Sequence, residues 1–158
     1  MIKKKILFIL LFLFIPIINV KGEELNLAAS AGSAILIEST TGKILYERNA
    51  HEKMAPASMT KIMTMLLIME SIDEGKISLD QNINISANAA SMGGSQVFLE
   101  PNTQMKAHEL IKSIAIASAN DAAVAMAETI SGTTDAFVKK MNEKCKALGC
   151  ENTLLMSM

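Results

Sequence analysis

The sequence has few side chains that could bind a metal ion or a nucleic acid. Its 158 residues include two cysteines and two histidines. Cys145 and Cys150 lack the cysteine or histidine partners of a zinc site. His51 and His108 stand alone, without carboxylates or metal ligands at a suitable spacing, and we interpret both as surface residues. In residues 23–158 positive charges form no cluster and the formal net charge is −5, which argues against a nucleic-acid partner. We therefore expect no metal, no cofactor and no nucleic acid.

No apolar run is long enough to span a bilayer. Residues 6–18 are almost wholly apolar, but this run is shorter than the roughly 20 residues that a membrane-spanning helix needs, and Pro16 interrupts it. Three lysines precede the run in residues 1–5, and small residues follow it at Val20 and Gly22. The pattern predicts a secretory signal peptide, residues 1–22, cleaved near Gly22. The alternative is an uncleaved anchor.

Loss of residues 1–22 would remove four lysines and no acidic residue, so the formal charge of residues 23–158 is −5. Half of the chain is hydrophobic, which suffices for one domain with its own core. An exported protein permits a disulfide, but joining Cys145 to Cys150 requires a local geometry that sequence does not show. We interpret both cysteines as structural thiols.

The remaining chain begins with two short runs of β-forming residues, Ala34–Ile37 and Lys43–Arg48, around the turn Glu38–Gly42. This pattern predicts an antiparallel hairpin. The stretch Thr40-Thr41-Gly42-Lys43 lacks the upstream glycine of a phosphate-binding loop, so we interpret it as the hairpin turn.

Several helices are expected after the hairpin. Pro56 is predicted to open one that ends before Gly75, and because it is apolar nearly all round we expect it to be buried. Residues 79–99 are predicted to be irregular. Three further helices are expected at about 107–117, 121–130 and 134–148. One hairpin followed by helices indicates an α+β domain.

A candidate nucleophile lies at the start of the first helix. In Ser58-Met59-Thr60-Lys61 the serine and the lysine are three positions apart, so they share a helical face. A desolvated lysine can be neutral and take the serine proton, and a helix N-terminus can stabilise an oxyanion. About one such Ser-x-x-Lys is expected by chance in this composition. The competing interpretation is a capping Ser58 and a solvated Lys61.

A second polar group must orient the lysine and help to protonate a leaving group. The sequence offers Ser86-Ala87-Asn88 and Ser118-Ala119-Asn120. The second lies between two apolar helices, where a tight turn can present both side chains to a cleft, although Ser118 or Asn120 could simply cap the next helix. Its place between two helices favours Ser118-Ala119-Asn120 over the first copy. Gly93-Gly94-Ser95 is either a flexible loop or part of a substrate rim.

Five stretches together resemble the low-molecular-mass penicillin-binding proteins, and among them the serine-type D-alanyl-D-alanine carboxypeptidases. The match extends over about residues 33–153. The stretches are Glu38–Tyr46, Pro56–Thr64, Gly93–Val97, Ser118–Ala123 and Met141–Thr153.

The resemblance implies a β-lactamase/penicillin-binding transpeptidase-like fold, an antiparallel sheet with a helical cluster. It implies that Ser58 attacks the carbonyl between the last two D-alanines of a peptidoglycan pentapeptide, with Lys61 as general base. Ser118 would relay protons to the leaving D-alanine, Asn120 would bind the substrate backbone, and water would release the product. β-Lactam antibiotics would acylate Ser58. Such a protein acts outside the cytoplasmic membrane, at the cell wall.

The sequence departs from the family at its end. The third motif of the family, Lys-Thr-Gly, does not occur, and Leu154–Met158 replaces the usual polar stretch. We therefore expect residues 23–158 to be the N-terminal part of the domain, incomplete at the C-terminus, and to be inactive and poorly stable alone. Membrane association would need a C-terminal segment that this sequence lacks. The alternatives are a class A β-lactamase, which usually has Asp where Ala119 stands, and a non-catalytic β-lactam-binding or wall-binding domain.

Overall fold

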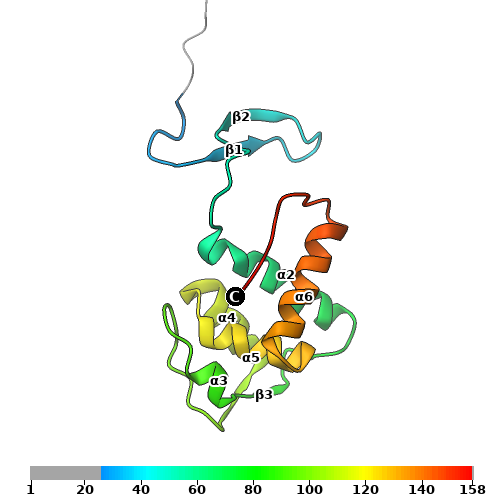
Figure 1. Cartoon of the computed structure of the whole chain (residues 1–158). Coiled ribbons are helices and arrows are strands. Elements are labelled where there is room, and N and C mark those ends of the chain that lie inside the picture. The colour runs from blue at the N-terminus through cyan, green and yellow to red at the C-terminus, as the bar shows by residue number, and fades with distance from the viewer. Residues whose placement is uncertain (1–25, 158) are drawn as a thin grey trace, which may run out of the picture. The chain divides into compact units, whose positions relative to one another are not determined.

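The computed structural model describes residues 26–157 (Figure 1). The predicted signal peptide and its cleavage point lie outside the described residues. The chain divides into two compact units, Met1–Met54 and Ala55–Met158. In the described part, every helix is too short or too polar to cross a membrane.

The first unit contains the predicted hairpin. Strand β1 (Ala34–Ile37) pairs antiparallel with β2 (Ile44–Arg48), and the register runs from Ala34 opposite Arg48 to Ile37 opposite Ile44. Gly42 has φ 71°, a conformation that costs glycine little, and it closes the turn by donating its N–H to the Glu38 carbonyl at 2.9 Å. The hairpin interpretation of this stretch is confirmed.

The Glu38 carboxylate organises the same turn. It accepts the backbone N–H of Thr40 at 2.8 Å and that of Thr41 at 2.7 Å, and it also accepts the Thr41 hydroxyl at 2.5 Å. These hydrogen bonds, that from the Thr41 side chain foremost, lower the pKa of Glu38 to about 2.

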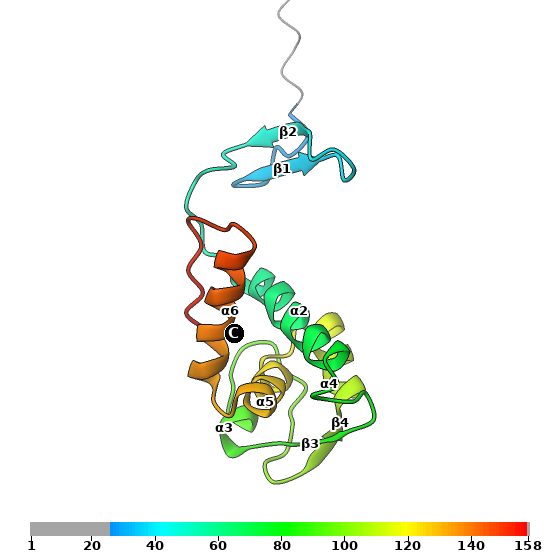
Figure 2. The ribbon, with the colours of Figure 1, turned by 90° about the vertical axis from the view of Figure 1, so that its right-hand side faces the viewer.

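Helix α5 (Asn120–Ser131) is the centre of the second unit (Figure 2). It contacts α2 (Thr60–Asp73), α3 (Ala87–Ala90), α4 (Ala107–Ala117) and α6 (Thr134–Ala147). Residues 121–127 of α5 are all buried, and four of them are alanines, which let neighbouring helices approach closely. The predicted helices at 107–117, 121–130 and 134–148 are confirmed to within one residue at each end.

The helix expected from Pro56 differs from the prediction in two respects. It starts as a single 3-10 turn, Ala57–Met59, and only then continues as α2. It is also buried on one face only, since Ile62 is 72% exposed and no part of the helical unit covers it. The apolar residues on both faces of this helix predicted that both would be buried. A face is buried only where another element packs on it, and α5 packs on one face of α2. The exposed stripe consists of Met59, Ile62, Leu66 and Met69.

The stretch predicted to be irregular contains regular structure. Strand β3 (Asn82–Asn84) pairs antiparallel with β4 (Gln104–Lys106), and the short helix α3 follows β3. Ile83 and Ile85 are buried between exposed asparagines, which is the alternation of a half-buried strand. Asparagine disfavours strands and the strands are only three residues long, so the pattern is weak in the sequence.

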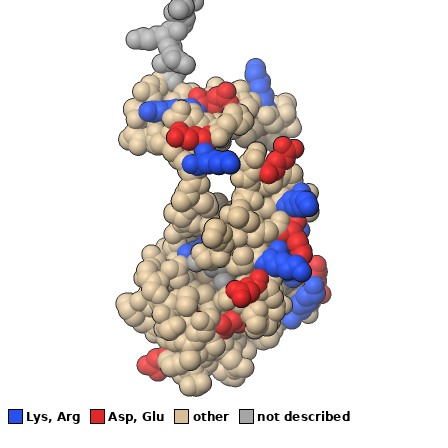
Figure 3. Space-filling view, viewed as in Figure 1, with Lys and Arg blue, Asp and Glu red and all other residues tan. Residues whose placement is uncertain are grey.

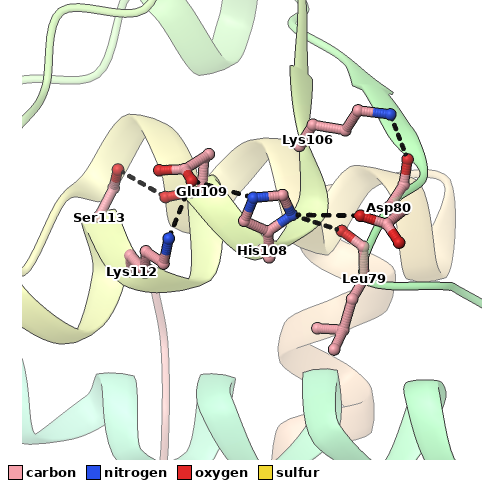
Figure 4. A network of polar contacts seen from close by, with 7 residues as sticks. All are labelled: Leu79, Asp80, Lys106, His108, Glu109, Lys112 and Ser113. Carbon is pink, nitrogen blue, oxygen red and sulfur yellow. Dashed lines mark hydrogen bonds and ion pairs between the residues drawn. The ribbon is translucent and has the colours of Figure 1, made fainter.

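His108, at the start of α4, is not isolated as its place in the sequence suggested (Figure 4). One ring nitrogen, Nδ1, lies 3.0 Å from the Leu79 carbonyl and 3.8 Å from Asp80 Oδ1, and Nε2 lies 2.9 Å from Glu109 Oε1. Lys106 Nζ also donates to the Asp80 carbonyl, at 2.6 Å. The cluster ties the segment before β3 to the start of α4, so His108 has a structural contact there.

Asp121 joins the loop of residues 92–99 to the start of α5. Its carboxylate is fully buried and accepts the backbone N–H of Val97 at 3.1 Å and that of Leu99 at 3.1 Å. It also accepts its neighbour's N–H, from Ala122, at 2.9 Å. A buried carboxylate needs such donors, and the positive end of the α5 dipole adds to them. The loop is therefore held at the position of Asp121.

The Glu38 turn should respond to acid. Because the folded pKa of Glu38 lies below its usual value of 4.5, the carboxylate stabilises the turn fully above that value and less as pH falls toward 2. A carboxyl ¹³C NMR titration should give a pKa of about 2. Thr41→Ala should raise it, whereas Ser39→Ala should leave it unchanged; equal titration of all three proteins would contradict the assignment.

Asp121→Asn should release the loop of residues 92–99. The amide group then places a donor against backbone donors, and we expect a loss of about 2–4 kcal/mol in the free energy of unfolding. Urea unfolding measures this loss, and hydrogen exchange at Val97 and Leu99 should accelerate. The matched control is Asp135→Asn, an exposed residue in the first turn of α6, for which we expect a cost below about 1 kcal/mol. Similar losses in the two variants would show that Asp121 is no anchor.

Candidate active site

Ser58 lies in the 3-10 turn that precedes α2, and its side chain is exposed. The residue before it, Ala57, has φ 47°, in a region that a residue with a Cβ rarely adopts. The Met59 N–H donates to the Pro56 carbonyl at 3.0 Å and closes the turn. Strained backbone of this kind clusters at functional sites. The turn thus presents the Ser58 hydroxyl to solvent at the end of a rigid helix.

Lys61 occupies the first full turn of α2, and only 8% of the residue is exposed. Its ammonium group donates to Asn120 Oδ1 at 2.5 Å. None of the ion pairs among residues 26–157 includes Lys61, so it has no carboxylate to hold its charge. Burial lowers the pKa of Lys61 from its usual 10.5. The interpretation of Lys61 as a solvated surface lysine is therefore wrong.

Asn120 is held on both sides of its amide. Oδ1 accepts a hydrogen bond from Lys61, and Nδ2 donates one to the Gly93 carbonyl at 2.7 Å. The Asn120 backbone N–H also donates to the Ser95 carbonyl, at 2.7 Å. These contacts fix the orientation of the amide. The N-cap of α5 is Ala119, and no side chain caps it, so the alternative of a purely capping Asn120 or Ser118 is excluded.

Gly94 gives the loop its close approach to Asn120. A Cβ at this position would lie 2.9 Å from Asn120 Nδ2, and φ is 78°, so a larger residue would be both strained and crowded. The sequence left the role of Gly93-Gly94-Ser95 open. In the structure these residues form the wall on which Asn120 is oriented, and Asp121 anchors the same loop.

Ser118 forms the turn between α4 and α5. It has φ 56° and ψ 34°, a left-handed conformation, and its residue is half-buried. A single left-handed residue lets the chain reverse between two helices, at a cost of roughly 1–3 kcal/mol for a residue with a Cβ. Since Asn120 follows two positions later, the same turn carries both side chains. Among the described residues, the hydroxyls of Ser58 and Ser118 have no hydrogen-bond partner that would occupy them.

The other Ser-Ala-Asn copy is used differently. Ser86 caps α3 by accepting the Ala89 N–H at 2.9 Å, and its hydroxyl donates to Glu128 at 2.6 Å. The Asn88 amide also donates to Glu128, at 2.7 Å. These side chains join α3 to the end of α5 and do not contact Lys61. The structure thus brings Asn120, rather than Asn88, to the lysine.

The arrangement has the parts of an activated serine nucleophile. Ser58 precedes, by three positions, a buried lysine whose pKa is lowered. Asn120 accepts a hydrogen bond from one of the three N–H groups of the lysine ammonium. In residues 26–157 no three His, Cys, Asp or Glu side chains are placed to hold a metal ion. Figure 3 shows that, on the face viewed, the charged side chains of the helical unit gather mainly along α6.

Comparison with known proteins identifies the family of the chain. The family model described as D-alanyl-D-alanine carboxypeptidase matches residues 19–157. The D-alanyl-D-alanine carboxypeptidase DacF of Bacillus subtilis is 62% identical over 128 residues, which are 81% of this chain and 33% of the relative. DacA of Escherichia coli is 40% identical over 129 residues, 78% of this chain and 32% of the relative.

Solved structures of carboxypeptidases and penicillin-binding proteins resemble this chain as well. The D-alanyl-D-alanine carboxypeptidase DacD from Francisella tularensis superposes with a TM-score of 0.81 at 38% identity, covering 86% of this chain and 33% of that one. Penicillin-binding protein 5 from Haemophilus influenzae gives 0.77 at 33% identity, covering 80% and 38%. The ampicillin-bound penicillin-binding protein D2 of Listeria monocytogenes gives 0.74 at 29% identity, covering 84% and 53%.

The chain spans about a third of the length of the curated relatives given above. Its small antiparallel sheets and helical cluster are the corresponding part of the penicillin-binding protein fold, so the predicted fold class and family are confirmed. With the sequence match, the superposition and the lysine–asparagine pair in agreement, the chain belongs to the D-alanyl-D-alanine carboxypeptidase family.

Proposed function

We propose that the protein containing this chain is a serine-type D-alanyl-D-alanine carboxypeptidase, which removes the terminal D-alanine from peptidoglycan stem peptides through an acyl-enzyme on Ser58. The observation that carries the proposal is the buried Lys61, held by Asn120 and without a carboxylate partner, one helical turn after an exposed serine. A buried lysine without a carboxylate partner is costly to the fold, and its lowered pKa is of use to a neighbouring nucleophile.

In the acylation step, neutral Lys61 takes the proton of the Ser58 hydroxyl as Oγ attacks the carbonyl carbon between the two D-alanines. The C–N bond then breaks, and the proton passes from Lys61 through the Ser118 hydroxyl to the leaving amine. Water attacks the resulting ester, one proton returns to Ser58, and the shortened peptide leaves. The free hydroxyls of Ser58 and Ser118 are compatible with these roles.

Asn120 serves both the lysine and the substrate in this mechanism. Its Nδ2 carries two protons, and the Gly93 carbonyl accepts one of them at 2.7 Å. The second proton remains for a carbonyl oxygen of the peptide. Because Gly93 and Ser95 hold the amide in place, substrate binding requires no reorientation of Asn120.

We place this activity outside the cytoplasmic membrane, at the cell wall. Residues 1–22 would be a cleaved signal peptide and residues 23–158 the N-terminal part of the carboxypeptidase domain. The leader pattern in residues 1–22 and the relatives named as penicillin-binding proteins support this assignment. β-Lactams would acylate Ser58, as an ampicillin-bound relative suggests.

Activity is proposed for a polypeptide that also contains the rest of the fold. No Lys-Thr-Gly occurs in the 158 residues, and the match covers about a third of each curated relative. The stripe of Met59, Ile62, Leu66 and Met69 on α2 is exposed although apolar, as expected where further structure covers it. Residues 23–158 alone should therefore be inactive.

A chimaera tests the proposal: residues 23–153 replace the matching part of the Bacillus subtilis relative, which supplies the remaining strands. We expect the chimaera to form a stable adduct with fluorescent penicillin and to release D-alanine from a pentapeptide. Ser58→Ala should abolish both, a loss of more than about 10³-fold in rate. The control is Ser78→Ala, an exposed serine, which should keep both activities.

The outcomes separate the alternatives. Rapid turnover of nitrocefin would indicate a β-lactamase, and stable labelling without D-alanine release would indicate a non-catalytic β-lactam-binding domain. A folded chimaera that does neither would refute the proposed nucleophile. Stoichiometric labelling of Ser58 in residues 23–158 alone would refute the requirement for the remaining strands.

The pH dependence of acylation should report Lys61. Because burial lowers the pKa of Lys61, the acylation rate should rise with pH and level off at an apparent pKa below 10.5. Asn120→Asp places a negative charge beside the ammonium group, which should raise that pKa and move the rate profile to higher pH. The control Asn152→Asp, on an exposed residue, should leave the profile unchanged. Stopped-flow acylation measures the three profiles; identical profiles would exclude Lys61 as the base.

A further inference from the structure

The end of α6 brings the two cysteines together. Gly149 has φ 81°, and its N–H donates to the Lys146 carbonyl at 3.1 Å. The Cys150 N–H donates to the Cys145 carbonyl at 2.9 Å. This pair of hydrogen bonds is a Schellman motif, in which the side chains of the first and last residues, here Cys145 and Cys150, meet. The helix end therefore brings the two cysteines close together, as a bridge requires.

The two thiols have unequal surroundings. Cys145 is 3% exposed and packs in the cluster that contains Phe137 and Met141, whereas Cys150 is exposed. Burial raises the pKa of the Cys145 thiol, and the neighbouring Cys150 thiol raises it further. The exposed Cys150 thiol can attack a dissolved reagent, whereas the buried Cys145 thiol can reach only its neighbour.

A cavity gives access to Cys150. It has a volume of about 530 Å³ and is lined by Cys150 together with residues from the last turns of α6 and the segment that follows. The lining carries one charge of each sign, from Lys146 and Glu151, beside the exposed Cys150. The cavity leaves the Cys150 thiol open to a dissolved disulfide.

We propose that Cys145 and Cys150 form a thiol–disulfide exchange site in which Cys150 reacts with a small-molecule disulfide and Cys145 resolves the adduct. The Cys150 thiolate attacks one sulfur of the reagent, the reagent's S–S bond breaks, and one thiol leaves. Cys145 then loses its proton to solvent and attacks the Cys150 sulfur, which releases the second thiol. The cysteine pair gives up two electrons and two protons, and the reagent is reduced to two thiols.

The product would fasten the segment after α6. Asn142 already holds Leu155 there, since its Oδ1 accepts the Leu155 N–H at 2.9 Å and its Nδ2 donates to the Leu155 carbonyl at 2.7 Å. Leu155 packs in the same cluster as Cys145. A Cys145–Cys150 bond would fix the other end of this short return, residues 150–155, to the helix. The site acts without Ser58 and is independent of the proposed carboxypeptidase activity.

The test treats the reduced full chain with oxidised glutathione and follows the intact mass. We expect the wild-type chain to lose two hydrogens and to retain no glutathione. Cys145→Ser should retain one glutathione, on Cys150, because the resolving thiol is gone. Cys150→Ser should stay unmodified over the same period, because its remaining thiol is buried. Stable glutathione adducts on the wild-type chain, or a Cys150→Ser variant that reacts as fast as wild type, would overturn the proposal.

A second measurement needs no variant. In a glutathione redox buffer, the equilibrium between dithiol and disulfide gives the effective concentration of one thiol at the other. Because the helix end holds the two together, this concentration should be about tenfold or more higher in native buffer than in guanidinium chloride. Equal values in the two solvents would show that the folded motif does not create the site.

Discussion

The hydrogen bond from the Lys61 ammonium to Asn120 Oδ1 is the contact on which the rest of the site depends. An ammonium group that is withdrawn from water must find an acceptor or lose its charge, and the site provides one amide oxygen and no carboxylate. The orientation of that amide depends on the Gly93 carbonyl, and the loop that carries Gly93 depends on the carboxylate of Asp121. The lysine is therefore positioned by a short series of hydrogen bonds that begins and ends on α5.

Strained backbone surrounds this series, and the core of the helical unit holds it in place. Ala57 and Ser118 both have positive φ, at roughly 1–3 kcal/mol each. Ser118 is followed by Ala119, which is fully buried, and by the buried first turns of α5. A left-handed residue between two packed helices has no room to relax. Ser118 therefore has a fixed position for the same reason that α5 is central: small, buried side chains let its neighbours pack closely around it.

Local patterns in the sequence predicted most of the helices, the hairpin and the Ser58–Lys61 pair, because each depends on residues close together in the chain. The strands β3 and β4 were missed, since their pairing joins residues some 20 positions apart and their asparagines disfavour strands. The anchoring role of Asp121 was missed for a related reason: its donors at Val97 and Leu99 precede it by 24 and 22 positions. The Gly93-Gly94-Ser95 stretch was open between a flexible loop and part of a substrate rim, and its contact with Asn120, some 27 positions later, was not visible in the sequence.

Helix α2 carries a site residue on one face and exposed apolar residues on the opposite, outer face. One side carries Lys61 with the buried Thr64, Leu67 and Ile68, and the other carries the exposed stripe. Full burial of a large apolar side chain contributes roughly 1.5–3 kcal/mol, so covering these four partly exposed side chains contributes at least as much as the strain at Ala57 and Ser118 costs. A helix is stiff, and a shift that accommodates one face moves the other. Packing against the outer face would thus stabilise the position of Lys61, which links completion of the fold to the geometry that a serine nucleophile requires.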